Sequence, residues 1–140
     1  MNEYPVDVHV EDGCVWVSSP DIPELHSAGD DEAEALLEAV DGLESALSIY
    51  VSQRRAIPAA SKPKKGQKTV RLPALTVAKI ALWNAMVEQG VGKAELARKL
   101  GVNLPQVDRL VDFLHNSKIE SVEHALELLG RRIRVIVEAA

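Results

Sequence analysis

Residues 93–110 read KAELARKLGVNLPQVDRL, and this stretch decides the fold of the C-terminal half. Seven of its positions carry the small and apolar residues that a helix-turn-helix needs: Leu96, Ala97, Leu100, Gly101, Val102, Val107 and Leu110. The small Ala97 lets two helices cross closely, and Gly101 can adopt the left-handed conformation of the turn. The spacing predicts a helix-turn-helix, and the alternative is the core of an ordinary helical hairpin.

In such a motif the second helix enters the major groove of DNA by its N-terminal end. The exposed side chains expected there are Asn103, Leu104, Gln106, Asp108 and Arg109. Gln106 can pair with adenine, and Arg109 can pair with guanine. Asp108 departs from the pattern because a carboxylate repels phosphate. It can accept from a cytosine amine, hold Arg109, or weaken binding.

Two further features support this interpretation. Asn103 with Gln106 three residues later forms a capping pair at the start of the second helix. Four basic side chains are the expected phosphate contacts: Lys93, Arg98, Lys99 and Lys118. For each lysine taken alone, a solvated surface position is the competing interpretation. One such motif covers few base pairs, so we expect a homodimer or a dimer of dimers.

The charge is divided unevenly along the 140 residues. Residues 1–60 carry 13 acidic and two basic side chains, a net charge of −11. Residues 61–140 carry 14 basic and eight acidic side chains, a net charge of +6. An acidic half suits a basic protein partner, and a basic half suits phosphates. The polarity predicts two modules with different partners.

Apolar and polar residues alternate in the N-terminal segment, which predicts a β-hairpin of two strands. Val6, Val8 and Val10 are separated by polar residues, and Asp12-Gly13 is a preferred two-residue hairpin turn. Cys14–Ser18 returns, Glu24–Ala28 reads as a short third strand, and Thr69–Pro73 as a last strand. Trp16 and Trp83 are expected in the core.

A helix is predicted from Asp31 to near Gln53, with Asp31 and Glu34 as a capping box. Its apolar stripe is Leu36, Val40, Leu43, Leu47 and Tyr50. Four more helices are expected over Thr76–Gln89, Lys93–Leu100, Leu104–Leu114 and Val122–Leu129. The Arg131–Val137 tail is β-prone and suited to pairing with another chain.

The predicted organisation has three parts. Residues 1–55, with a last strand at 69–73, form an α+β module, and residues 56–68 are a linker rich in Pro, Ala, Lys and Gly. Residues 74–140 form an all-α helix-turn-helix domain that also dimerises. No apolar run spans a membrane, and no secretion signal starts the chain, so we expect a cytoplasmic protein.

The order of short motifs resembles the HicB antitoxins, in the branch with a C-terminal helix-turn-helix. Three segments of the first half carry the likeness: Tyr4-Pro5-Val6, Asp21-Ile22-Pro23-Glu24 and the acidic helix start Gly29–Ala35. The second half adds Asn84-Ala85, Glu95-Leu96-Ala97-Arg98, Arg109-Leu110 and Lys118-Ile119. Together they cover nearly the whole chain in order.

The resemblance implies a partial RNase H-like β-β-β-α-β module that blocks HicA, a small basic mRNA-cleaving toxin. It also implies that the C-terminal domain binds the operator of the toxin–antitoxin operon and represses it. An acidic module is a sensible mimic of the RNA substrate of such a toxin. For the toxin contact, the expected residues are Asp21, Glu24, Asp30 and Asp31.

Catalysis is not expected. Asp7, Glu11, Asp12 and Asp21 are the carboxylates available for RNase H-type metals, but the first alternate with His9 as on a solvent-facing strand. The four histidines have no ligand spacing, and Cys14 has no partner base nearby in sequence. We therefore expect no catalytic residue, metal or cofactor. The alternative function is a one-component transcription regulator whose N-terminal half senses a small ligand.

Overall fold

The predicted hairpin forms the start of the sheet. Strand β1 (Glu3–Glu11) pairs antiparallel with β2 (Cys14–Ser18), from Glu11 opposite Cys14 to Asp7 opposite Ser18. Between them Asp12 and Gly13 have φ values of 52° and 75°, so both turn residues are left-handed, as a tight hairpin with the right strand twist requires.

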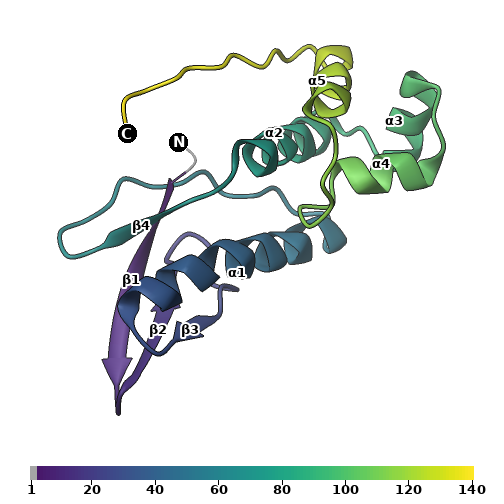
Figure 1. Cartoon of the computed structure of the whole chain (residues 1–140). Coiled ribbons are helices and arrows are strands. Elements are labelled where there is room, and N and C mark those ends of the chain that lie inside the picture. The colour runs from purple at the N-terminus through teal and green to yellow at the C-terminus, as the bar shows by residue number, and fades with distance from the viewer. Residues whose placement is uncertain (1–2) are drawn as a thin grey trace.

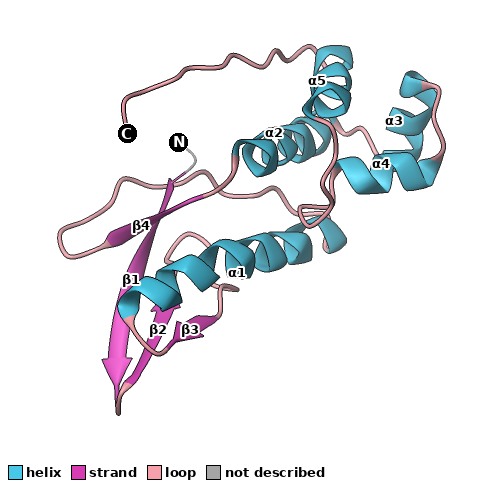
Figure 2. Cartoon of the chain, in the orientation of Figure 1, coloured by secondary structure: helices cyan, strands magenta, loops and turns pink. Residues whose placement is uncertain are grey.

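The computed structural model describes residues 3–140, and within them two more short strands complete the sheet (Figure 1). Strand β3 (Ser27–Gly29) pairs with β2, and β4 (Lys68–Arg71) pairs with β1, each antiparallel. The strand order is therefore β3-β2-β1-β4. With helices following (Figure 2), the fold is of the predicted α+β class.

Helix α1 (Glu32–Ser52) packs on the sheet. Asp31 caps it, since its carboxylate accepts from the Glu34 N–H at 2.8 Å, but the Glu34 side chain makes no return bond to the Asp31 N–H, so half of the predicted capping box forms. Leu43, Leu47 and Tyr50 are buried as expected, but Leu36 and Val40 are only half-buried. Small residues, Ala35 and Ala39, occupy the centre of the buried face there, because the helix start runs close against β3.

The segment between α1 and β4 has no regular structure but is attached to the rest of the protein. The Tyr4 hydroxyl donates to the Pro58 carbonyl at 2.6 Å, and burial raises the pKa of Tyr4 to about 12. Ile57 is 3% exposed, and its backbone N–H and C=O both bond the side-chain amide of Asn84, at 2.8 and 3.0 Å. These contacts order the stretch 56–68 in part.

Four helices follow in residues 74–140: α2 (Ala74–Gln89), α3 (Lys93–Leu100), α4 (Leu104–Leu110) and α5 (Ile119–Leu128). Helix α4 ends four residues before the predicted Leu114. The Asp112 carboxylate accepts from the Leu114 N–H at 3.0 Å, a local bond that competes with helix continuation. Residues 131–140 form no helix or strand in this single chain.

One continuous core runs from Tyr4 to Leu129, with α2 between the sheet side and α5 (Figure 1). Trp83 is 5% exposed as expected, and its indole N–H donates to the Arg55 carbonyl at 2.7 Å. The expectation for Trp16 is wrong: it is 39% exposed and stacks on His9, with ring centres 3.8 Å apart. None of the described helices is long and apolar enough to cross a membrane.

Candidate functional sites: a basic groove and an acidic groove

Helices α3 and α4, joined by residues 101–103, are the two helices of the predicted helix-turn-helix. Gly101 ends α3 with φ of 69°, and the Val102 N–H returns to the Ala97 carbonyl at 3.0 Å. Ala97 is buried where the helices meet, and Val107 is fully buried on the inner face of α4. The left-handed glycine closes the helix end, and the turn directs α4 across α3.

The start of α4 is held by a complete capping box. The Asn103 carboxamide oxygen accepts from the Gln106 N–H at 3.0 Å, and the Gln106 side-chain oxygen accepts from the Asn103 N–H at 3.1 Å. Pairing with adenine needs both the oxygen and the nitrogen of the Gln106 side chain. Adenine pairing therefore competes with the cap, whereas the Gln106 amide nitrogen is available to donate.

The other residues expected to contact DNA lie on the exposed surface around α4. Leu104 is 46% exposed, and Arg109 is exposed near the C-terminal end of α4. Asp108 pairs with Lys93 of α3, with 2.9 Å between Nζ and Oδ1. The carboxylate thus links the two helices of the motif and lowers the positive charge that Lys93 offers. Arg98, Lys99 and Lys118 are exposed.

A groove of about 280 Å³ runs beside α4 and the start of α5, and we name it the basic groove. Its lining residues are Leu100, Val102, Gln106, Arg109, Leu110, His115, Ser117, Lys118, Ser121 and His124. Two permanent cations, Arg109 and Lys118, line it together with two histidines and without a carboxylate. The groove thus brings together three residues that the sequence predicts as DNA contacts, Gln106, Arg109 and Lys118.

Sequence reasoning missed the buried lysine beneath this surface. Lys79 of α2 has a fully buried side chain, and its ammonium donates to the carbonyls of Arg109, Asp112 and His115 at 2.9, 2.7 and 2.7 Å. Burial lowers the pKa of Lys79, and the charges of Asp112 and Glu44 oppose that shift. The available signal was the lysine's position in the apolar run Val77–Leu82.

The residues expected to contact the toxin do not form one cluster. Asp21 accepts from the Ser61 N–H and hydroxyl at 2.8 and 3.0 Å, and Asp31 caps α1. Glu24 accepts from the Tyr50 hydroxyl at 2.6 Å and from the Arg55 guanidinium at 2.9 Å. These two hydrogen bonds lower the pKa of Glu24. Three of the four residues thus hold the fold itself, and Asp30 is exposed.

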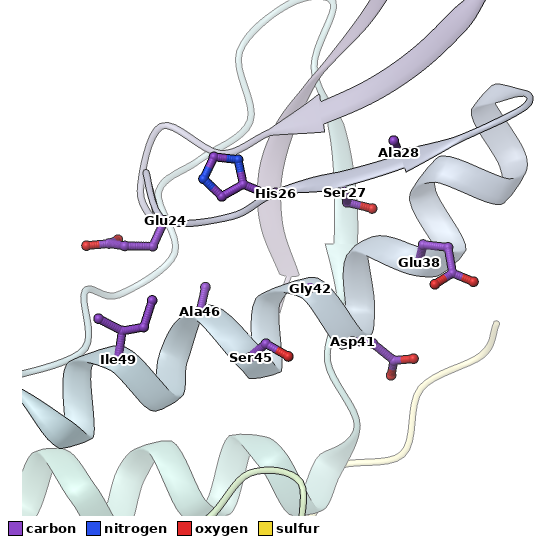
Figure 3. A pocket seen from close by; sticks show the side chains of 10 residues that line it. All are labelled: Glu24, His26, Ser27, Ala28, Glu38, Asp41, Gly42, Ser45, Ala46 and Ile49. Carbon is purple, nitrogen blue, oxygen red and sulfur yellow. The ribbon is translucent and has the colours of Figure 1, made fainter.

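An acidic groove of about 430 Å³ lies between β3 and the outer face of α1 (Figure 3). Its lining residues are Glu24, His26, Ser27, Ala28, Glu38, Asp41, Gly42, Ser45, Ala46 and Ile49. Glu24 lies at one end and Glu38 at the other, with Asp41 and Ser45 along the helix (Figure 3). Glu38 and Asp41, which the sequence analysis did not single out, are exposed and available to a partner.

Two of the four carboxylates considered for metals, Asp7 and Asp21, have hydrogen-bond partners within the protein. Asp7 accepts from the Gln67 side-chain amide at 3.2 Å, and Asp21 bonds Ser61. Within residues 3–140, no group of three or more His, Cys, Asp or Glu side chains is placed to hold a metal ion. Cys14 is an exposed free thiol at the hairpin.

Comparison with known proteins shows which sequences this chain resembles. The sequence model of the HicB-like antitoxin of bacterial toxin–antitoxin systems matches residues 3–81. The chain is 60% identical to Antitoxin HicB of Pseudomonas fluorescens, over all of this chain and 97% of that protein. It is 38% identical to Antitoxin HicB 2 of Photorhabdus laumondii and 30% identical to Antitoxin HicB of Escherichia coli, over 94% and 98% of those proteins. The chain therefore belongs to the HicB-like antitoxin family of bacterial toxin–antitoxin systems.

Proposed function

We propose that this antitoxin neutralises a HicA-like mRNA-cleaving toxin through its N-terminal module and represses its own operon through the helix-turn-helix. The full-length similarity to three HicB antitoxins carries the first half of the proposal. These relatives also favour a toxin partner over the small ligand of a one-component regulator. Membership of an antitoxin family points to a regulatory protein rather than an enzyme.

The acidic groove is the toxin surface that the geometry supports best. Three carboxylates, Glu24, Glu38 and Asp41, line it, in a half of the chain with a net charge of −11. A basic partner is attracted to such a surface, and complementary charge raises the rate of association. Asp30, exposed just before α1, is a further carboxylate of this half of the chain.

Operator binding is supported by the exposed start of α4 and by the basic groove beside it. The N-terminal residues of a recognition helix read base edges, while surrounding cations hold phosphates. In this proposal the bases are contacted by Leu104, Gln106 and Arg109. The phosphates are contacted by Arg98, Lys99 and Lys118. Lys93 contributes through its pair with Asp108, which fixes α3 against α4.

The C-terminal tail supplies the dimer contact in this proposal. Val135, Ile136 and Val137 are 80%, 74% and 91% exposed, in a stretch of β-branched residues that forms no strand in the single chain. Pairing of two tails would cover these side chains and give the two half-sites that an operator requires. Both proposed partners, a toxin and operator DNA, place the protein in the cytoplasm.

The test is co-expression of this chain with the small protein encoded beside it. We expect growth to be arrested by the small protein alone and restored by co-expression, with the two proteins co-purifying. DNA from upstream of the operon should then be retarded by the purified chain. A toxin that this chain neither binds nor silences would refute the first half, and absence of specific retardation would refute the second.

A further inference from the structure

Lys79 is a charged side chain at a place where charge is costly. It lies in the apolar middle of α2, and none of its side chain is exposed. A buried ammonium is tolerated only when its N–H groups are satisfied. Lys79 meets that condition in full, because an ammonium has three donors and each donates to a different carbonyl, at 2.7–2.9 Å.

All three acceptors lie where α4 ends. Arg109 is in the last turn of α4, and Asp112 and His115 are in the turn that leads to α5. The last carbonyls of any helix lack partners within it and carry partial negative charge, which a cation stabilises. Helix α4 has only seven residues, too few to be stable without tertiary contacts. The Lys79 ammonium therefore supplies the hydrogen-bond donors and the positive charge that the C-terminal end of this short helix lacks.

The backbone segment that Lys79 binds also bears side chains that line the basic groove. Arg109 and Lys118 line the groove, and so do His115 and Ser117, which lie in the turn between them. The Ser117 hydroxyl also donates to the Arg109 carbonyl, at 3.2 Å, and contacts the His115 ring at 3.0 Å. The buried Lys79 ammonium thus binds the backbone segment that lies between the two exposed cations, Arg109 and Lys118.

We infer that Lys79 is a positioning residue for DNA binding: its ammonium fixes the end of α4 and the following turn, and so sets the spacing of Arg109 and Lys118. Lys79 does not touch DNA in this scheme, because it is fully buried. The inference rests on the proposed operator binding. It adds that affinity for the operator depends on a residue of α2, outside the helix-turn-helix itself.

The test is Lys79→Met, which keeps the length of the side chain and removes its donors. Val122→Ala is the matched control, because Val122 is fully buried in α5 and donates to no carbonyl of the turn. Both full-length variants are assayed where each is more than about 95% folded. We expect Lys79→Met to weaken operator binding at least about ten-fold and Val122→Ala less than about three-fold. Amide hydrogen exchange over residues 109–117 should accelerate in Lys79→Met alone.

Equal operator affinities for the two variants would overturn the inference. Should Lys79→Met fail to fold, nitrogen-15 NMR of the unaltered protein gives a second measurement. Ammonium protons of Lys79 that exchange slowly with water support the inference, and protons that exchange like those of exposed lysines overturn it. If the unaltered protein does not bind its operator, the proposed function fails, whereas hydrogen exchange and NMR still report on Lys79.

Discussion

At the scale of single residues, Arg109 is the side chain whose loss tests DNA reading most directly. It is exposed on α4 and lines the basic groove, and a bidentate contact of arginine with guanine is worth about 1–3 kcal/mol. We expect Arg109→Ala to weaken specific operator binding about ten-fold or more, and to leave toxin neutralisation unchanged. Fluorescence anisotropy with labelled operator measures the first effect, and growth rescue measures the second.

The control for that substitution is Lys62→Ala. Lys62 is exposed in the segment before β4. Its substitution removes one positive charge, as Arg109→Ala does, but at a site outside the helix-turn-helix. Its effect on operator affinity should be small and should vanish at higher salt, as for a distant charge. Loss of neutralisation by a folded Arg109→Ala protein would show that the two activities share a surface.

Glu24 makes the stability of the N-terminal module depend on pH. Because hydrogen bonds from Tyr50 and Arg55 lower the pKa of Glu24, its carboxylate stabilises the fold above the ordinary pKa of about 4.5. That contribution is lost as the pH falls through the lowered pKa. We expect Glu24→Gln to lower the free energy of unfolding by only about 1 kcal/mol at pH 7, since the side chains of Glu24 and Arg55 are partly exposed.

Urea titrations at pH 7 and pH 3 check this expectation. The difference between Glu24→Gln and the unaltered protein should shrink as the pH falls from 7 through the lowered pKa of Glu24, because protonation removes the charge that Glu24→Gln lacks at every pH. Glu38→Gln removes an equal charge from an exposed position of α1 and is the matched control for the loss of one negative charge. A difference that stays constant with pH would mean that the Tyr50 and Arg55 bonds do not depend on ionised Glu24.

Residue-level features were predictable where they depend on neighbours in sequence. The caps at Asp31 and Asn103 involve partners three residues away: the capping box at Asn103 forms in full, and the one at Asp31 forms through the Asp31 carboxylate alone. Contacts between distant residues were not predictable: Lys79 meets acceptors 30 to 36 residues further on, and Glu24 meets Tyr50 26 residues on. Asp21 likewise meets Ser61, 40 residues further on. Such long-range bonds explain why Glu24 and Asp21 have partners within the fold.

At the scale of elements, Gly29 sets how closely α1 approaches β3. A Cβ at this position would lie 2.6 Å from the backbone nitrogen of Ala35 and 3.0 Å from Glu34. Backbone cannot move aside as a flexible side chain can, so the helix start would shift. We expect Gly29→Ser to lower the free energy of unfolding by about 1–3 kcal/mol, measured by thermal melting.

Gly92→Ser is the same substitution at a glycine with space around it. Nothing lies within 4 Å of a Cβ there, and the residue is the N-cap of α3, a position that serine favours. It should be neutral or slightly stabilising. If Gly29→Ser melted like Gly92→Ser, close packing of α1 on β3 would not be the reason for a glycine at position 29.

Elements with their own sequence periodicity were predictable, whereas the end of α4 depends partly on a tertiary contact. The hairpin at Asp12-Gly13 and helices α1 and α3 follow the predicted patterns. Helix α4 ends early because Asp112 and Lys79 bind the backbone beyond Leu110. Trp16 is exposed because its strand neighbours, Val15 and Val17, take the buried face of the same alternation.

At the scale of the whole molecule, α2 connects parts of the chain that charge and composition distinguish. Toward the sheet side, Trp83 donates to Arg55, and Thr76 donates to the buried Glu44 of α1. Toward the other side, Lys79 holds the end of α4, and the Gln89 side chain donates to the Leu129 carbonyl at 2.7 Å. The uneven division of charge between the two halves of the chain predicts two binding activities. It does not predict that α2 contacts both halves.

These contacts lead us to expect that the folded chain unfolds as one cooperative unit. The buried apolar cluster is continuous from Tyr4 to Leu129, so neither side can unfold without exposing a face of α2. Hydrogen exchange measured by mass spectrometry at increasing urea concentration reports on β1 and α5 separately. We expect the two peptides to share one midpoint, and calorimetry to give an unfolding enthalpy of about 100 kcal/mol for 140 residues near 60 °C. If α5 exchanged at a lower urea concentration than β1, the helix-turn-helix would be an independent domain, and the bonds of Lys79 and Gln89 would be too weak to couple it to the sheet.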